Sequence, residues 1–507
     1  MDQTQRFTPA AGRATARAPG GAPSRRAVLS GAALAAFWGE QTARADQPVR
    51  HSAAPPVQTT GAGPLVRLVQ RVTMGLTAAE LQAARQLGRE GYLEHQLAYE
   101  SIDDSVLAAR LANYATLTME PYQLFPLQPQ QVVNELIEAT ILRSVLSKRQ
   151  LLERMVEFWT DHFNIDINKN LDRFLKTVDD REVVRAHALG AFPALLSASA
   201  HSPAMLYYLD NNVSFVGNPN ENYARELLEL HTMGADGAYT QMDVEEVARC
   251  FTGWTFYPAN AGVNAGKFRF LAGQHDNGAK QVLGYGIPAG GGYNDGLIVL
   301  DILANHPDTA RYVSAKLCRW LYHYDPPASL VSSVAATYTA TGGDIRGMIR
   351  TALLKHDLAA AEPKYKRPYH LFVSALRACG ATITNLNGIR SNLLAAGQVP
   401  YYWSPPDGYP DHLDFWVGLA LPRWNFGASL LNAQVNGASV DINAFFAGVP
   451  NNADGLAAHI DRALFGGEMS PFERQRIRDY LLPNAPTTQR KRDALGLAIA
   501  SPGYQWY

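Results

Sequence analysis

Apolar residues recur at helical spacing along most of this chain of 507 residues. Between positions 149 and 163, for example, Leu152, Met155, Trp159 and Phe163 fall on one face of a helix. This pattern, read together with capping residues and prolines at helix starts, predicts helices at 77–87, 149–163, 181–198, 203–209, 219–233, 240–251, 294–304, 307–322, 328–339, 344–355, 367–379 and 386–396. We therefore predict a mainly α fold, built as one large multi-helix body.

In one stretch the apolar residues alternate with charged ones, which is the spacing of a strand and not of a helix. Phe268 and Phe270 alternate with Lys267 and Arg269, and residues 277–278 form an Asn-Gly dipeptide typical of a hairpin turn. Residues 281–283 would form the return strand. This predicts a small β-hairpin inserted in the helical body. Residues 400–410, which are rich in proline and aromatic side chains, predict an ordered loop.

The N-terminus has three features of an export signal, in the expected order. The pair Arg25-Arg26 is followed by a short apolar run at 31–38 and then by residues 43–45, an Ala-Arg-Ala cleavage pattern. The apolar run is too short to span a bilayer. We predict a twin-arginine signal peptide at 1–45, a flexible linker at 46–62 and a single large helical domain at 63–507. The mature protein would be periplasmic or secreted, without a transmembrane segment.

Composition narrows the class of partner. The formal net charge is −1 and there is no basic block, so a nucleic-acid partner is not expected. Cys250, Cys318 and Cys379 match no metal or redox spacing. We interpret them as small buried residues.

The helix predicted at 219–233 carries a dense cluster of ionisable residues. At 100° per residue, its polar side chains share one arc: Glu221, Asn222, Arg225, Glu226, Glu229 and Thr232. His231 falls on the apolar side. The arc is either a solvent-exposed face with ion pairs four residues apart, or the wall of a cleft. In a cleft, the carboxylates would bind a divalent cation or perform acid–base catalysis.

Two other groups of residues are candidates for chemistry. His275, Asp276 and Lys280 flank the predicted hairpin turn, where they would either meet an anionic or sugar substrate or simply form the turn. Asp161 and His162 would supply a base and the residue that orients it. Because adjacent helix positions point in different directions, we interpret His162 as a core residue and Asp161 as a surface residue.

Two motifs follow one another along the chain: residues 220–234, Asn-Glu-Asn-Tyr-Ala-Arg-Glu-Leu-Leu-Glu-Leu-His-Thr-Met-Gly, and the block at 243–254. The first is similar to the hallmark of one bacterial family, known only as domain of unknown function 1800, and the second is similar to that family's next motif. The resemblance implies an exported, largely helical protein, often encoded beside a phosphatase- or sulfatase-like partner. It implies no reaction and no catalytic residues.

Three functions are compatible with these observations. The first is an enzyme that acts on an extracellular polymer or glycan by hydrolysis or elimination, with a site made of Glu221, Arg225, Glu226, His231, His275, Asp276 and Lys280. The second is a non-catalytic partner or assembly factor of an exported phosphatase- or sulfatase-like protein. The third is a metal-dependent periplasmic redox protein. The sequence identifies no cofactor and leaves a divalent metal ion open.

Overall fold

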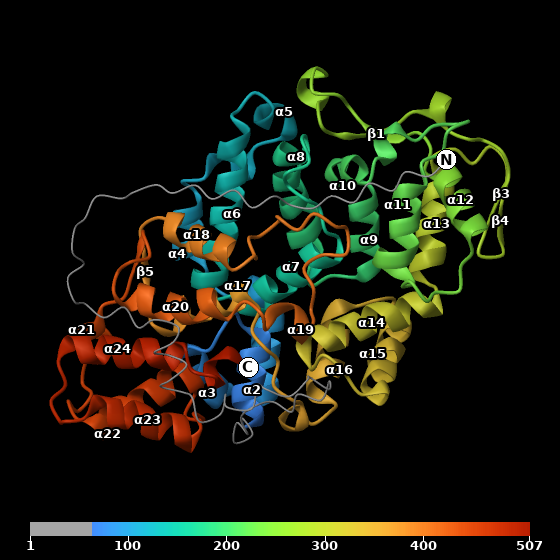
Figure 1. Ribbon diagram of the computed structural model, residues 1–507. Coiled ribbons are helices and arrows are strands. Elements are labelled where there is room, and N and C mark those ends of the chain that lie inside the picture. Colours follow the sequence, from blue (N-terminus) through green and yellow to red (C-terminus); the bar gives the residue numbers. More distant parts are fainter. Residues whose placement is uncertain (1–62) are drawn as a thin grey trace, which may run out of the picture.

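Helices make up most of residues 63–507, the part of the chain that this computed structural model describes (Figure 1). This confirms the mainly α fold. The predicted signal peptide and linker lie outside the described residues. Within 63–507, no helix combines the length and the apolar character needed to cross a membrane.

The first half of the described chain forms helices α2 to α12. Their bounds are α2 Pro64–Val72, α3 Ala78–Leu97, α4 Ser105–Leu111, α5 Pro121–Leu124, α6 Pro129–Leu146, α7 Gln150–His162, α8 Asp172–Asp179, α9 Phe192–Ala200, α10 Pro203–Tyr208, α11 Glu221–Glu226 and α12 Gln241–Cys250. Thr77 and Thr240 cap the starts of α3 and α12, since each hydroxyl accepts a hydrogen bond from the backbone N–H three residues later. Helix α3 continues beyond its predicted end because Gly88, at φ 72°, kinks it without ending it.

The second half forms helices α13 to α24. Their bounds are α13 Asn294–Ala304, α14 Pro307–Leu321, α15 Ala328–Thr341, α16 Ile345–Leu354, α17 Pro368–Ala378, α18 Asn387–Ala395, α19 Leu413–Trp416, α20 Ala420–Leu431, α21 Ile442–Phe445, α22 Ala453–Ile460, α23 Pro471–Leu481 and α24 Thr488–Ile499. The predicted boundaries agree within two residues for α13 to α18. Residues 400–410 form the predicted loop between α18 and α19.

Among residues 63–507, three π-helical turns interrupt the α-helices. They are Asp180–Arg185 after α8, Leu227–Thr232 after α11, and Asp461–Phe465 after α22. The single helix predicted at 181–198 is therefore wrong. The chain leaves the helical conformation near Gly190, because the backbones of Gly190 and Phe192 form hydrogen bonds with residues 343–345.

Three small antiparallel sheets of two strands lie among the described helices. β1 (Trp254–Phe256) pairs with β2 (Phe268–Phe270), β3 (Lys280–Val282) with β4 (Tyr285–Ile287), and β5 (Thr382–Ile383) with β6 (Ala438–Ser439). A small hairpin is present, as predicted, and its strands are β3 and β4. The predicted pairing of 267–270 with 281–283 is wrong, because 268–270 pair with β1. The chain reverses at Leu283 and Gly284, which both have the positive φ of a two-residue hairpin turn.

Two hydrophobic clusters form the core of the described chain. The first is built mainly from α2, α3 and α7 to α16, and the second from α6, α17, α18 and α20 to α24. In Figure 1 the C-terminal helices α21 to α24 lie beside α20, away from α13 to α16. Cys250, Cys318 and Cys379 are buried and free, as predicted.

Candidate functional site

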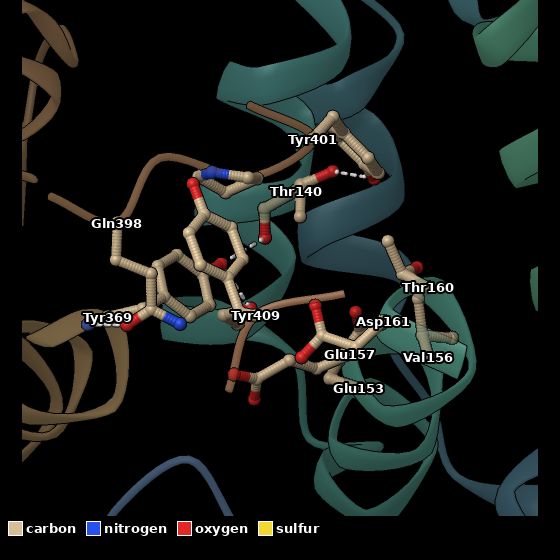
Figure 2. A pocket seen from close by; sticks show the side chains of 12 residues that line it. Thr140, Glu153, Val156, Glu157, Thr160, Asp161, Tyr369, Gln398, Tyr401 and Tyr409 are labelled. Atoms are coloured by element: carbon tan, nitrogen blue, oxygen red, sulfur yellow. Dashed lines mark hydrogen bonds between the residues drawn. The ribbon is translucent and has the colours of Figure 1, made fainter. Parts of the chain in front are cut away.

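Helix α7 has one apolar face and one acidic face. Leu151, Met155 and Trp159 are almost fully buried in the first cluster. On the opposite side, Glu153, Glu157 and Asp161 follow one another at intervals of four residues. This carboxylate face of α7 (Glu153, Glu157 and Asp161) borders a cavity of about 40 Å³ between α6, α7 and the loop that carries Tyr401 and Tyr409 (Figure 2).

Arginines neutralise this carboxylate face. Glu153 accepts hydrogen bonds from both terminal nitrogens of Arg185, at 3.1 and 3.0 Å. Arg367, just before α17, joins the other two acids: it contacts Glu157, and its Nη1 donates to Asp161 at 2.7 Å. Charge-assisted contacts of this kind fix the side chains they join.

A larger cavity of about 270 Å³, the Lys316 cavity, opens at Asp161. Its walls come from α7, α14, the π-helical turn after α11 and the loop 407–412. The ionisable side chains that line it are Asp161, His162, Lys316, Arg319, Arg367, Asp407, Asp411 and His412. Aromatic rings of Phe158, Tyr312, Trp320 and Tyr409 complete the walls. Such a mixture of apolar walls and converging charges is typical of ligand-binding sites.

The ammonium group of Lys316 is available for chemistry. It makes no hydrogen bond or ion pair with any residue in 63–507, and its nearest ring contact is Tyr312, at 5.5 Å from the ring centroid. Burial lowers the pKa of Lys316 to about 8, against the pull of Asp161 and Asp407. At neutral pH this side chain therefore carries a proton that it can release.

Arg319 lies one turn further along α14 and adds a second cation. Its Nε donates to the Tyr324 carbonyl at 3.1 Å. Neither of its terminal nitrogens has a partner within the described chain. Together with Lys316 it presents uncommitted donors to the cavity, as binding of an anionic group requires.

Asp161 is the carboxylate whose protonation is most readily changed in this cavity. Its side chain keeps 18% of its surface exposed, on the wall of the cavity. Burial, helped by the neighbouring Glu157, raises the pKa of Asp161 to about 6 although Arg367 opposes this shift. The interpretation of Asp161 as a surface residue was wrong, because Arg367 and the loop 407–412 cover it. His162 is buried, as predicted.

Two side chains, Asn164 and Lys364, hold the loop that closes the cavity. Asn164 donates to the carbonyls of Trp403 and Pro405, at 2.9 and 2.7 Å. Lys364 donates to Asp411 at 2.8 Å and also to a carbonyl at the end of α14. These contacts place the loop against α7 and α14, so the site is rigid rather than formed by a free loop.

The helix predicted at 219–233 contributes Leu230 to the wall of this cavity, but none of the residues of its polar arc lines it. Glu221 and Arg225 pair at 3.0 Å and are 40% and 41% exposed, so they behave as the predicted solvent-exposed pair. Glu226 is half-buried, and burial together with the adjacent Glu229 raises its pKa. Thr232, predicted on the polar arc, is fully buried because the π-helical turn shifts its direction.

His231 belongs to the core rather than to a reactive surface. It is buried, and its carbonyl contacts Nε2 of His162 at 3.0 Å. Burial, with a smaller effect from Lys316, lowers the pKa of His231 to about 3. The ring is therefore neutral at ordinary pH.

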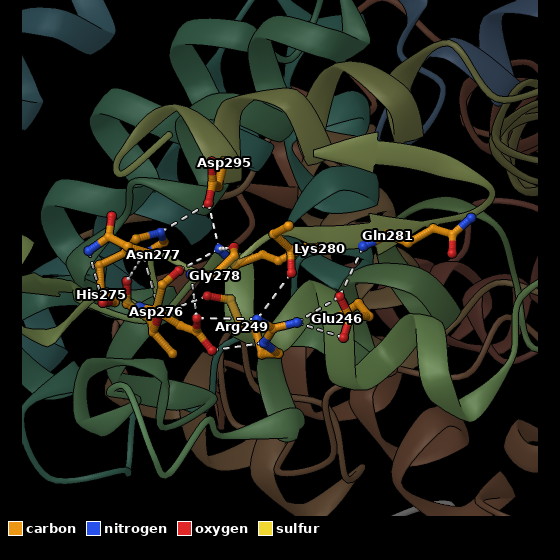
Figure 3. Close-up of polar contacts among 11 residues, drawn as sticks. Glu246, Arg249, His275, Asp276, Asn277, Gly278, Lys280, Gln281 and Asp295 are labelled. Carbon is orange, nitrogen blue, oxygen red and sulfur yellow. Dashed lines mark hydrogen bonds and ion pairs between the residues drawn. The ribbon is translucent and has the colours of Figure 1, made fainter. Parts of the chain in front are cut away.

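His275 and Lys280 converge on a buried carboxylate that the sequence did not predict (Figure 3). Asp295, at the start of α13, lies 3.1 Å from His275 Nε2 and 2.6 Å from Lys280 Nζ, and all three side chains are fully buried. Asp276 turns outward to Arg249, at 2.8 Å, and this arginine lowers the pKa of Asp276 to about 2. The group joins β3, α12 and α13 and has no access for substrate.

Thus none of the seven residues predicted from the sequence lines the cavities described here. The signal that would have found the site is the spacing of Glu153, Glu157 and Asp161 on the polar face of α7. Among residues 63–507, no group of three or more histidines, cysteines or acids is arranged to hold a metal ion.

Comparison with known proteins agrees with the motifs. Residues 67–506 match the family model described as "Protein of unknown function (DUF1800)". The chain belongs to this family. No curated protein and no solved structure matches this DUF1800 protein. Its activity therefore has to be inferred from the site itself.

Proposed function

We propose that this DUF1800 protein is an exported acid–base enzyme that cleaves an anionic polymer or glycan by hydrolysis or elimination in the Lys316 cavity. The observation that carries this proposal is the presence of an unpaired lysine and a partly buried aspartic acid, Asp161, on the walls of one cavity. The predicted twin-arginine signal supports the extracellular location.

Asp161 is the general base and Lys316 the general acid. In hydrolysis, Asp161 takes a proton from water as the oxygen attacks the substrate, and Lys316 gives its proton to the leaving oxygen. In elimination, Asp161 takes the proton from a substrate carbon, a double bond forms, and Lys316 again protonates the leaving oxygen. Two groups whose surroundings bring their pKa values to about 6 and about 8 suit this division at neutral pH.

Charge and size narrow the class of substrate. Arg319 and the ammonium of Lys316 favour a carboxylate or sulfate group on the substrate. At about 270 Å³ the cavity suits one sugar unit, with the rest of a chain outside. Tyr312, Trp320 and Tyr409 provide apolar surface for a ring face.

The test is cleavage of defined polymers by the mature protein. Alginate, polygalacturonate and chondroitin sulfate are compared with neutral dextran. New reducing ends report both reactions, and ultraviolet absorbance of the unsaturated product reports elimination alone. Asp161→Asn and Lys316→Met should each lower the rate by about 10²–10⁴-fold.

Glu221→Gln is the matched control because it removes one charge from an exposed pair outside the cavity. It should retain the activity of the unmodified protein. If Asp161→Asn and Lys316→Met kept full activity, or if Glu221→Gln lost as much as they did, the assignment to the Lys316 cavity would be wrong.

A further inference from the structure

A third and larger cavity, the Arg143 cavity, lies at the other end of the carboxylate face of α7. It measures about 480 Å³ and is lined by segment 100–111, the end of α6, the start of α7 and Arg185. Glu153 borders this cavity, whereas Asp161 borders the Lys316 cavity, so the two cavities are separate.

Arg143 is the unusual side chain in this cavity. Its side chain is 17% exposed, and its guanidinium makes no hydrogen bond with any residue in 63–507. The nearest partner of this guanidinium is Asp180, at 3.7 Å, and its Nη1 is buried without an acceptor. Leaving a buried N–H without an acceptor is unfavourable, because that donor has lost water and gained nothing.

Asp180 lies too far from Arg143 for a hydrogen bond and is held by other residues. Its Oδ2 accepts from Arg185 Nε at 2.8 Å, and its Oδ1 accepts from the Tyr401 hydroxyl at 3.0 Å. Arg185 in turn is occupied by Asp180 and Glu153. Nη1 of Arg143 faces Asp180, and the other guanidinium donors, which have no partner within residues 63–507, remain for a ligand.

The acids around the cavity also have partners. Glu153 is neutralised by Arg185, and Glu100 by Arg346. Asp104 accepts from the Ser147 hydroxyl at 2.6 Å and from the Lys148 N–H at 3.0 Å. Asp103 lies on the exposed surface, where it accepts from the Ser105 N–H. None of these carboxylates is directed to Arg143 by a hydrogen bond.

The rest of the wall is apolar. Ile102, Leu107 and Leu152 are buried side chains that border the cavity, and Leu111 is half-buried beside them. A ligand that filled this space would need an apolar body as well as an anionic head.

We propose that the Arg143 cavity binds an organic anion with an apolar body, of which a monocarboxylate is the simplest case. The two carboxylate oxygens accept from the guanidinium of Arg143, and the hydrocarbon part lies against Ile102, Leu107 and Leu152. Arg149, whose Nε and Nη2 donate to the Ile102 carbonyl, holds this wall in place. The proposal does not depend on the reaction assigned to the Lys316 cavity.

Calorimetric titration of the mature protein with hexanoate tests this inference, with inorganic sulfate and hexanol as comparison probes. Hexanoate should bind, and both comparison probes should bind at least about tenfold more weakly because each lacks one of the two recognised parts. Arg143→Gln should weaken hexanoate binding by a similar factor. Arg390→Gln is the matched control, since it removes the same charge from a half-buried pair with Glu138 outside the cavity.

A second variant tests the cavity in case Arg143→Gln loses binding only because the protein unfolds. Ala108 is exposed at the cavity, so Ala108→Trp would fill the space without removing a buried group, and it should also abolish binding. Lys316→Met should leave binding unchanged. The inference is overturned if hexanoate does not bind, if sulfate binds equally well, if Arg143→Gln and Ala108→Trp bind normally, or if Lys316→Met is the variant that loses binding.

Discussion

Gly408 lies so close to Asp161 that a Cβ on this glycine would stand 2.1 Å from the Asp161 carbonyl oxygen. Its φ of +76° is also one that other residues rarely adopt. We expect Gly408→Ala to lower the free energy of unfolding by about 1–3 kcal/mol and to reduce kcat, because the loop 407–412 must move away from α7. Urea denaturation and the polymer assay measure the two effects.

Gly418→Ala is the control for that substitution. Gly418 is exposed, with no atom within 4 Å of the added Cβ. The free energy of unfolding of Gly418→Ala should differ from that of the unmodified protein by less than about 0.5 kcal/mol. Equal behaviour of the two variants would mean that contact between the loop and α7 does not shape the site.

The pH dependence of cleavage follows from Asp161 and Lys316. When the pH is below the Asp161 pKa of about 6, this carboxyl holds a proton and cannot accept one. When the pH is above the Lys316 pKa of about 8, this amine has lost the proton that it must donate. We therefore expect kcat/KM to be bell-shaped between these values. In Lys316→Arg the rate should fall and the decline above a pH of about 8 should disappear, because arginine keeps its proton and can neither lose it nor donate it. An unchanged upper limb in this variant would contradict the role of Lys316.

Chemical labelling provides a test of Lys316 that needs no substrate. An amine with a pKa of about 8 is unprotonated more often at pH near 8 than an ordinary lysine, whose pKa is about 10.4. Trinitrobenzenesulfonate, an anionic amine reagent, should therefore modify Lys316 before the exposed Lys355. Peptide mass spectrometry measures the order. Preferential labelling of Lys355 would show that Lys316 is not activated.

Because of His231, the free energy of unfolding should decrease as the pH falls below about 6.5. Its pKa is lowered to about 3 in the folded protein, against about 6.5 when unfolded. The unfolded chain therefore takes up a proton between these values that the folded chain does not. Stability from this group is fully present above about pH 6.5 and is lost as the pH falls toward 3, by about 2–3 kcal/mol at a pH near 4.5.

His231→Gln should lose less stability than the unmodified protein between pH 7 and a pH near 4.5, in urea denaturation at both values. His356→Gln replaces a half-exposed histidine and should show the full loss. The same acid sensitivity in both variants would mean that other groups dominate it.

Lys280 is expected to matter for folding and not for catalysis. Lys280→Met would leave the fully buried carboxylate of Asp295 with His275 as its only side-chain partner in the described chain. This should cost about 3–5 kcal/mol of stability, and Asp295→Asn in the same chain should restore part of it. Chemical denaturation and kcat are measured together. A lower kcat with unchanged stability would return Lys280 to the list of catalytic candidates.

Local signals in the sequence predict the helices but not the site. The bounds of α13 agree with the prediction because its start, its periodicity and its end are all encoded nearby. By contrast, Arg367 reaches Asp161 across 206 residues. The burial that raises the pKa of Asp161 comes from α14 and the loop 407–412, and no spacing within α7 reveals those neighbours.

The same reason explains why the residues beside the predicted hairpin turn were misleading. His275 and Lys280 contact the carboxylate of Asp295, which lies in α13. A cluster of ionisable residues in sequence can thus hold a fold together as readily as it can perform chemistry.

The π-helical turn at Leu227–Thr232 has a consequence for how this segment tolerates change. Here the backbone accommodates one more residue than a regular α-helix would over the same rise, as the bond from the Met233 N–H to the Leu228 carbonyl at 2.8 Å shows. Deleting a single residue would restore a regular helix and leave the segments on either side nearly in place, because the turn holds its extra residue locally. The residues inside the turn would change direction instead, among them His231, whose carbonyl contacts His162. The number of residues in this turn therefore decides which of its side chains and carbonyls meet the core.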